Sequence, residues 1–151
     1  MSNASSTIRP VTKADALAWE AMRSDLWPDE SGEHPSTVQQ FFEGTIPYIE
    51  EVLLALDDTK VVGFAELSIR NIVDGCESGR VAYLEGWYVK PGARGKGIGH
   101  ALVKAAEEWG RAQGCTEFAS DVEIENEASA RLHRALGFEE TSRVICFRKD
   151  L

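Results

Sequence analysis

LEGWYVKPGARGKGIGHALVKAAEEW, residues Leu84–Trp109, contains three kinds of local pattern in succession. An apolar run ends at Lys90-Pro91, and a loop with glycine at positions 92, 95, 97 and 99 follows. Apolar side chains then recur at helical spacing, at Ile98, Leu102, Ala105, Ala106 and Trp109. The pattern predicts a strand, a tight glycine loop and a helix that lies on a sheet.

A glycine loop between a strand and a helix is typical of an anion site. The first amide groups of a helix lack intrahelical partners, and the helix dipole is positive there. Glycines allow a phosphate to approach the backbone, and Arg94 and Lys96 add positive charge. A P-loop would need Lys-Ser where Ile98-Gly99 stand. The dinucleotide-binding pattern G-x-G-x-x-G fails as well, because the glycines here read G-x-G-x-G and follow a meander. Arg94–Gly99 instead satisfies the phosphate-loop pattern R-x-x-G-x-G.

The patterns around this loop predict the other elements. Runs rich in β-branched and aromatic residues at 48–58, 60–70 and 80–89 predict an antiparallel meander. We expect an extended segment at 7–11, a helix at 14–27 that starts at a Thr12–Asp15 capping box, and a second helix capped by Ser36. After the loop helix we expect a strand at 115–122, a helix at 126–136 and a last strand at 139–149. The predicted fold class is α+β, with a mixed, mostly antiparallel sheet, a central parallel βαβ unit and flanking helices.

Length and composition indicate one globular domain. The chain has 151 residues, of which 43% are hydrophobic and 27% charged, and we expect a single domain at 7–151 after a disordered lead-in at 1–6. The formal charge of −9 argues against a nucleic-acid partner and favours cationic ones. Three widely spaced cysteines suggest neither a metal site nor a disulfide framework. With no signal-peptide pattern and no apolar run of about 18 residues, we expect a cytoplasmic protein without a membrane partner.

The glycine loop and a later segment together resemble the GNAT superfamily of acyl-CoA-dependent N-acyltransferases. The later segment is NEASARLHRALGFEE, in which an Asn begins a helix that ends in LGF. The resemblance implies that acetyl-CoA is the co-substrate and that no metal is needed. It implies that the loop binds the pyrophosphate and that the strand before it pairs with the pantetheine arm. The implied cofactor-binding residues are Trp87, Tyr88, Val89, Arg94, Gly95, Lys96, Gly97, Ile98, Gly99, His100 and Asn126.

Several short sequence segments are similar to segments of a more specific group, the type I aminoglycoside 6′-N-acetyltransferases. They include LWP at 26–28, GFAELSIR at 63–70, GCTEFASD at 114–121 and ALGFEETSRVICFRK at 135–149. This resemblance implies acetylation of the 6′-amine of aminoglycoside antibiotics, and hence resistance, by direct attack in a ternary complex. It also implies a homodimer, and the apolar last strand suggests a surface through which two copies pair.

An aminoglycoside is a polycation, so its site should offer carboxylates and a flat aromatic ring. Trp27, Glu85 and Asp121 supply these groups, and Glu30 extends the acidic wall. We assign Asp121 as the group that deprotonates the amine, directly or through water, and Glu85 as the second carboxylate and alternative base. Each has a structural alternative: Trp27 as a core residue and Asp121 as a turn cap, whereas an unpaired Glu85 in an apolar strand favours function.

Three positions depart from the patterns of the related families. Ile72 stands where a Tyr often covers the substrate, and Ser142 where a carboxylate helps to hold it. His133 replaces a Tyr that protonates the leaving thiolate in many GNAT enzymes, and it also fits a structural role. Other acceptors are a polyamine, a small metabolite amine or a protein N-terminus. A non-catalytic CoA-binding module and a nucleotide-dependent kinase are the further alternatives.

Overall fold

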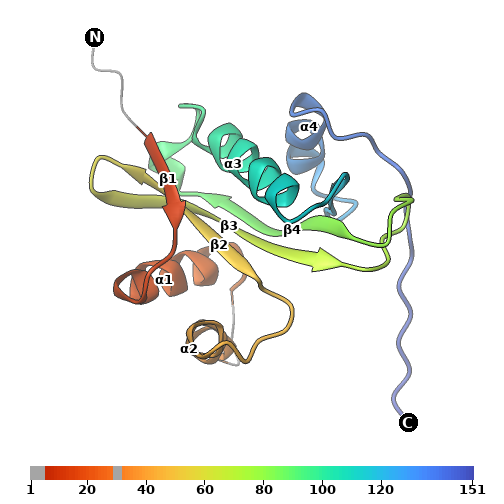
Figure 1. Ribbon diagram of the computed structural model, residues 1–151, viewed down its shortest axis with the longest axis horizontal. Helices are drawn as coiled ribbons and strands as arrows, with labels where there is room; N and C mark the ends of the chain where they lie inside the picture. The colour runs from red at the N-terminus through yellow and green to blue at the C-terminus, as the bar shows by residue number, and fades with distance from the viewer. Residues whose placement is uncertain (1–5, 29–31) are drawn as a thin grey trace.

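The computed structural model describes residues 6–28 and 32–151, and its centre is a five-stranded sheet (Figure 1). Helices α1 and α2 lie on one face of this sheet, and α3 and α4 on the other. None of the helices in the described ranges has the length and apolarity that a bilayer crossing requires. The elements are β1 Ser6–Pro10, η1 Lys13–Asp15, α1 Ala16–Leu26, α2 Glu33–Glu43, β2 Glu51–Asp57, β3 Lys60–Arg70, β4 Val81–Val89, η2 Pro91–Ala93, α3 Ile98–Ala112, β5 Phe118–Ser120 and α4 Glu127–Ala135.

The strand order in the sheet is the order in the chain, β1-β2-β3-β4-β5. The first four strands are antiparallel neighbours, and β4 and β5 are parallel. Helix α3 provides the crossover that a parallel pair needs. The predicted fold class is therefore confirmed, with the meander and the single βαβ unit in the expected places.

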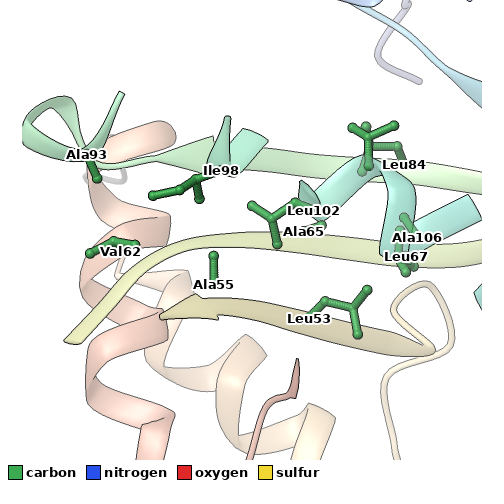
Figure 2. Packing of buried hydrophobic residues seen from close by; sticks show 11 residues of the cluster. Leu53, Ala55, Val62, Ala65, Leu67, Leu84, Ala93, Ile98, Leu102 and Ala106 are labelled. Carbon is green, nitrogen blue, oxygen red and sulfur yellow. The ribbon is translucent and has the colours of Figure 1, made fainter. Parts of the chain in front are cut away.

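Two apolar clusters hold the layers together, one on each face of the sheet. Figure 2 shows the cluster on the α3 face, where Leu102 and Ala106 of α3 lie among residues of the central strands such as Ala65 and Leu67. On the other face, Trp19 and Met22 of α1 pack with residues of β2, β3 and α2, and both are completely buried. The amphipathic stripe predicted for the loop helix is thus the surface that α3 places on the sheet.

The structure confirms the capping box and corrects the start of the second helix. The Thr12 amide and hydroxyl both donate to Asp15 Oδ2 at 2.8 Å, directly before α1. Helix α2 begins at Glu33, and its N-cap is Gly32 with φ of 75°, so Ser36 lies inside the helix and does not cap it. Ser6, expected in the lead-in, is the first residue of β1, and residues 1–5 lie outside the described residues.

The C-terminal part differs most from the prediction. Strand β5 is only Phe118–Ser120, shorter than the expected 115–122. The strand expected at 139–149 does not form within this chain, and the segment runs away from the body (Figure 1). Its β-forming side chains are present, but a strand also needs a neighbouring backbone to pair with. The prediction of a last strand is wrong for the single chain.

Candidate active site

The second edge of β4 is open over half its length. Strand β4 pairs with β3 along 81–89, but it pairs with β5 only from Ala82 to Leu84. From Glu85 to Val89 its backbone therefore has a strand neighbour on one side only. A free strand edge can pair with the amide groups of an extended ligand.

A β-bulge begins at the same point. Gly86 is paired with Glu66, and Leu84 with Leu67, so Glu85 is an extra residue in β4 without a counterpart in β3. A bulge bends the strand and changes the direction of a side chain, and bulges are frequent beside active sites. The sequence pattern of β4 did not reveal this bulge.

The glycine loop joins the open strand to α3 with two residues in the left-handed region. Gly95 and Gly97 have φ values of 80° and 81°, and nothing lies within 4 Å of where a Cβ would be. The first main-chain bond of α3 runs from the Ala101 amide to the Gly97 carbonyl, so the amides of 98–100 precede the helical bonding pattern. These amides and the dipole of a 15-residue helix form the expected site for an anion.

The side chains predicted for the cofactor site have different surroundings. Lys96 and His100 are exposed, whereas Ile98 is buried in the core below α3. Arg94 donates from Nε to the Val89 carbonyl at 2.8 Å, which ties the loop to the end of β4. Ile98 can therefore contribute only its backbone to a ligand.

Two aromatic residues of β4 brace the site from opposite faces. The Trp87 indole donates to the Gly99 carbonyl at 3.2 Å, and a Cβ on Gly99 would lie 3.1 Å from the indole ring. Tyr88 is buried in the other cluster beside Phe64, with ring centroids 6.0 Å apart. At these positions the side chains support the strand, and the backbone faces the open edge.

Glu85 and Asp121 belong to one polar cluster. Arg70 donates from Nε and Nη2 to the two carboxylate oxygens of Glu85, at 2.9 and 2.8 Å, and the Ser68 hydroxyl donates to Glu85 Oε1 at 2.6 Å. The Arg70 guanidinium lies 3.6 Å from the centroid of the Tyr83 ring, and the Tyr83 hydroxyl donates to Asp121. The Arg70 side chain thus binds Glu85 and also contacts Tyr83, the residue that binds Asp121.

The protonation states follow from these contacts. Burial, followed by the hydrogen bond to Asp121, raises the pKa of Tyr83 well above its usual range, so the phenol remains a donor at neutral pH. The hydrogen bonds to Glu85 raise the pKa of Arg70, which remains charged. Glu85 is half-buried and receives three hydrogen bonds, whereas Asp121 is exposed. An approaching cation can reach Asp121 more easily than Glu85.

Trp27 lies against the same part of β4. A Cβ on Gly86 would lie 2.4 Å from the Trp27 ring, so the ring contacts the backbone of the residue next to Glu85. The Arg23 guanidinium lies 5.0 Å from the Trp27 ring centroid. Arg23 also donates from Nε to His34 Nδ1 at 3.1 Å, which leaves the proton of the ring on Nε2, 2.6 Å from the Trp27 carbonyl. One edge of the Trp27 ring packs against the backbone at Gly86, and the residue is 36% exposed, so part of its surface is accessible to a ligand.

Two predicted acceptor residues lie in exposed segments, and a third lies outside the described residues. Ile72 is 87% exposed in the connection between β3 and β4, and Ser142 is exposed in the C-terminal segment. These segments meet where Thr141 contacts Gly75. Glu30 lies outside the described residues. The roles of these residues remain predictions.

Asn126 and His133 belong to α4 and its N-cap. Asn126 is the N-cap of α4, and its side-chain oxygen accepts from the Ser129 amide at 3.1 Å, so its NH₂ group is not part of this bond. His133 Nδ1 donates to the Ser129 carbonyl at 2.7 Å, and Nε2 lies within hydrogen-bond distance of the Ser120 hydroxyl, at 2.9 Å. The His133 ring also packs edge-on against Trp87. These contacts give His133 the structural role that the sequence allowed.

Sequence reasoning missed Ser68, Arg70 and Tyr83. Ser68 and Arg70 are two residues apart in one strand, as are Tyr83 and Glu85 in the next, and residues two apart point to the same face. The two-residue spacing is visible in the sequence, but the register in which β3 and β4 pair is not. Among residues 6–28 and 32–151, no group of three or more His, Cys, Asp or Glu is arranged to hold a metal ion.

Comparison with known proteins agrees with this geometry. The model of the Acetyltransferase (GNAT) family matches residues 19–138. An aminoglycoside N(6')-acetyltransferase type 1 from Klebsiella aerogenes is 50% identical over 151 residues, which cover 99% of each chain. The structure of AAC(6')-Iy with the bisubstrate analog CoA-S-monomethyl-acetylneamine is 37% identical with a TM-score of 0.88, and it covers 97% of this chain and 99% of that one.

A second solved structure gives the same result. AAC(6')-Ih from Acinetobacter baumannii, an aminoglycoside antibiotic 6'-N-acetyltransferase, is 38% identical with a TM-score of 0.87, and it covers 97% of this chain and 99% of that one. Both likenesses extend over nearly the whole chain at well above 25% identity. The open strand, the glycine loop and these matches together show that the chain belongs to the GNAT family of acetyltransferases.

Proposed function

We propose that the protein transfers the acetyl group of acetyl-CoA to the 6′-amine of aminoglycosides and thereby confers resistance to them. The names of its relatives support this acceptor. The observation that carries the proposal is the position of the cluster around Glu85 and Asp121 directly beside the open part of β4. A thioester on the strand edge would meet a cationic nucleophile held by these carboxylates.

Acetyl-CoA would bind across β4 and the start of α3. The pyrophosphate would lie on the amides of Gly95 to His100, with Arg94 and Lys96 adding positive charge. The pantetheine arm would pair with the backbone of 87–89, and one of these amides would polarise the acetyl carbonyl. The Asn126 NH₂ group would donate to the arm from the α4 side.

The chemistry needs a neutral amine and a departing thiolate. The neutral amine nitrogen forms a bond with the thioester carbonyl carbon and loses a second proton to become the amide. The carbon–sulfur bond breaks, and the CoA thiolate takes up one proton to leave as the thiol. Asp121 would accept the proton of the ammonium, directly or through a water molecule. Glu85 is held by Arg70 and Ser68, which suits it to orientation better than to proton transfer. No acyl-enzyme is formed in this scheme.

The acceptor site would use charge and one aromatic face. The protein carries a formal charge of −9, which favours the approach of a polycation. The exposed part of Trp27 would cover a sugar ring, and Glu30, Ile72 and Ser142 would complete the wall. Since the last two replace a Tyr and a carboxylate, they would adjust which aminoglycosides bind well.

The test is an amine panel with detection of the free CoA thiol. We expect fast turnover with kanamycin and tobramycin and much slower turnover with spermidine, small metabolite amines and peptide N-termini. Faster turnover of a polyamine than of either drug would assign the enzyme to the alternative acceptor class. Binding of CoA without turnover on any amine would support a non-catalytic module instead.

The proposed functional unit is a cytoplasmic homodimer in which residues 7–151 of each copy form one acetyltransferase domain. The three free cysteines fit a reducing compartment. The family match spans 19–138, inside the proposed domain. Large apolar side chains exposed near the C-terminus support the dimer.

A further inference from the structure

Arg70 is a cation in the place where the proposed function puts a polycationic substrate. Its guanidinium binds Glu85 through two nitrogens, with 2.9 Å from Nε to Oε1 and 2.8 Å from Nη2 to Oε2. The Arg70 side chain is 42% exposed, so a molecule bound at the carboxylates also comes close to this charge. A fixed cation weakens the binding of an ammonium beside it, and its presence in the site therefore needs a reason.

The position of Arg70 is fixed by two strands. The guanidinium lies 3.6 Å from the centroid of the Tyr83 ring on β4. Glu85 Oε1 also accepts from the Ser68 hydroxyl at 2.6 Å, and Ser68 lies two residues before Arg70 on the same face of β3. A planar guanidinium that is bound through two nitrogens and stacked on a ring has little freedom to swing away when a substrate arrives.

Three ionisable groups face Arg70 from the neighbouring elements. Glu85 and Tyr83 belong to β4, and Asp121 directly follows β5. The hydrogen bond to Glu85 has the largest effect in raising the pKa of Arg70, and Asp121 also raises it. Burial and the hydrogen bond to Asp121 raise the pKa of Tyr83, so the phenol carries no charge at neutral pH. With both carboxylates ionised, one guanidinium leaves the cluster with a single net negative charge.

A single net negative charge matches a single ammonium group. Without Arg70, the same ammonium would meet two uncompensated carboxylates, which would bind it more tightly but would also hold its proton more strongly. A neighbouring cation has the opposite effect, because it lowers the pKa of an amine beside it. Attack on a thioester needs the neutral amine, so tighter binding of the ammonium alone would slow the reaction.

We propose that Arg70 is a positioning residue that sets the charge of the acceptor site, so that the bound ammonium can lose its proton to Asp121 and attack as the neutral amine. Arg70 acts by neutralising Glu85 and by its own positive charge. It takes up no proton and forms no bond with the reacting atoms. The proposal rests on the proposed transfer of an acetyl group to an amine, and it adds the residue that controls the protonation of that amine.

The first test compares two substitutions of Arg70 that differ in charge. R70K keeps the cation, whereas R70Q keeps a hydrogen-bond donor for Glu85 without the charge. In R70Q the acidic limb of kcat, at saturating kanamycin and acetyl-CoA, should move to higher pH by about one unit, and KM for kanamycin should fall. On that limb, kcat should be about tenfold lower than in the wild type. R70K should keep the limb of the wild type.

Arg111→Gln is the matched control for the loss of one positive charge. Arg111 pairs with Glu107 and Glu108 on the exposed face of α3, and R111Q should keep the kcat profile of the wild type. The double variant R70Q/E85Q removes one charge of each sign and leaves no unpaired carboxylate, so its limb should return to the wild-type position even if R70Q itself does not fold. A shifted limb in this double variant would refute the proposal.

Other outcomes separate this proposal from the proposed function. An unchanged limb in R70Q, or an equal shift in R70K, would make Arg70 a structural support only and would leave the acetyltransferase activity intact. Absence of thiol release by the wild type with every amine would refute the proposed function and, with it, the role of Arg70.

The second test measures the proton directly and does not depend on which step limits kcat. Kanamycin is titrated calorimetrically into the complex of the enzyme with CoA, which carries no acetyl group, in buffers of different ionisation enthalpy at about pH 8. The number of protons taken up per bound kanamycin should be larger for R70Q than for the wild type and R70K. Equal numbers for the three proteins would overturn the proposal.

Discussion

At the scale of single residues, the carboxylates of Glu85 and Asp121 have different surroundings. Glu85 receives Arg70 in a bidentate arrangement and the Ser68 hydroxyl, and its side chain is 20% exposed. Asp121 receives the Tyr83 hydroxyl and is exposed. Glu85 is therefore enclosed by donors, whereas Asp121 is accessible, and for this reason we propose Asp121 as the group that binds the ammonium and takes its proton.

Replacing Asp121 with Asn should therefore stop proton acceptance and leave cofactor binding intact. We expect kcat with kanamycin to fall by about a hundredfold or more, because this is the usual size of a general-base contribution. The acetyl-CoA dissociation constant, measured by calorimetry, should change by less than about twofold.

Glu123→Gln is the matched control for this substitution. Glu123 is an exposed carboxylate two residues further along the same segment, and its loss should leave kcat unchanged. Equal turnover of D121N and the wild type would remove Asp121 from the proposed role. Equal loss in E123Q would point to the general negative charge of the region instead.

Asp15 gives a prediction about acid stability. The hydrogen bonds from Arg9 Nη1 and Nη2, at 2.8 and 3.0 Å, hold the pKa of the Asp15 carboxyl well below its ordinary value of 3.8. The native state therefore binds fewer protons than the unfolded state, so this stabilisation is full above the unfolded pKa and is lost as pH falls toward the folded one. Asp15→Asn should cost about 1 kcal/mol at neutral pH.

The measurement is the urea midpoint of D15N and wild type between about pH 7 and pH 2. The difference should be constant in the neutral range and should shrink in acid as Asp15 of the wild type becomes protonated. Asp58→Asn serves as the control, since Asp58 lies in an exposed turn with φ of 58°, a value that Asn also tolerates. A difference between D15N and wild type that did not depend on pH would contradict the assignment.

At the scale of elements, the loop between β4 and α3 requires glycine for its backbone geometry. A left-handed φ costs a residue with a Cβ about 1–2 kcal/mol, and Gly97 has this geometry as the N-cap of α3. Space is not the constraint, because nothing lies within 4 Å of a Cβ at Gly97. Conformation is the reason for glycine here, and the open space would admit the phosphate proposed for this loop.

Gly97→Ala should weaken acetyl-CoA binding by about tenfold, in line with the cost of the left-handed backbone or its rearrangement. Gly92→Ala is the matched control in the same loop, because Gly92 also has open space and does not have a positive φ. Calorimetric titration of both variants with acetyl-CoA measures the difference. Equal affinities would show that the loop backbone does not contact the cofactor.

At the scale of the whole molecule, one buried ion pair joins both helices on the α1 face to the sheet. Arg23 of α1 donates to Glu66 of β3, and the Trp19 indole donates to Glu66 Oε1 at 3.0 Å. Arg23 also bonds to His34 of α2. Burial raises the pKa of Glu66, and Arg23 opposes this effect. The network fixes the end of α1, and therefore Trp27, relative to β4.

Arg23→Met should destabilise the protein by about 3–5 kcal/mol, because it leaves the Glu66 carboxylate buried without its cation. The double variant R23M/E66M should recover most of this loss, since an apolar pair of similar volume needs no counter-charge. Urea unfolding midpoints, compared at unchanged m-values, measure the change in unfolding free energy for the single and the double variant. A double variant as unstable as R23M would show that packing, not charge, accounts for the loss.

The stability of the R23M variant should depend on pH. Without Arg23 the native state favours protonated Glu66, whereas in the unfolded state this carboxyl has its ordinary pKa of 4.5. The native state then binds more protons, so the stability of R23M should decrease as pH rises from about 5 to about 8. A pH-independent difference from the wild type over this range would contradict a buried ionised Glu66.

Much of the fold and part of the site followed from local patterns. The stripe from Ile98 to Trp109, the capping box at Thr12 and the β-branched runs each depend on residues near one another in the chain, so their spacing predicts them. The glycine turn at the start of α3, where we propose an anion site, was predictable for the same reason. Glu85 and Asp121 were identified as residue types, but their partners were not.

The residues that complete the site come from pairings that no local pattern contains. Arg70 meets Glu85, and Tyr83 meets Asp121, only because β3, β4 and β5 pair in one register, with a bulge at Glu85. A shift of one residue in that register would move every side chain to the other face.

The amino-acid sequence by itself determined most of the elements, their order, the glycine turn at the mouth of α3 and the acidic character of the proposed acceptor site, because each depends on backbone preference or composition over short distances. Only the tertiary structure decided that β4 and β5 stop pairing after Leu84, that Arg70 binds the Glu85 carboxylate, and that residues 142–149 form no strand within their own chain. The physical reason is that hydrogen bonds between strands and burial of charges are satisfied by residues far apart in the chain, and the C-terminal segment has the side chains of a strand but lacks a neighbouring backbone.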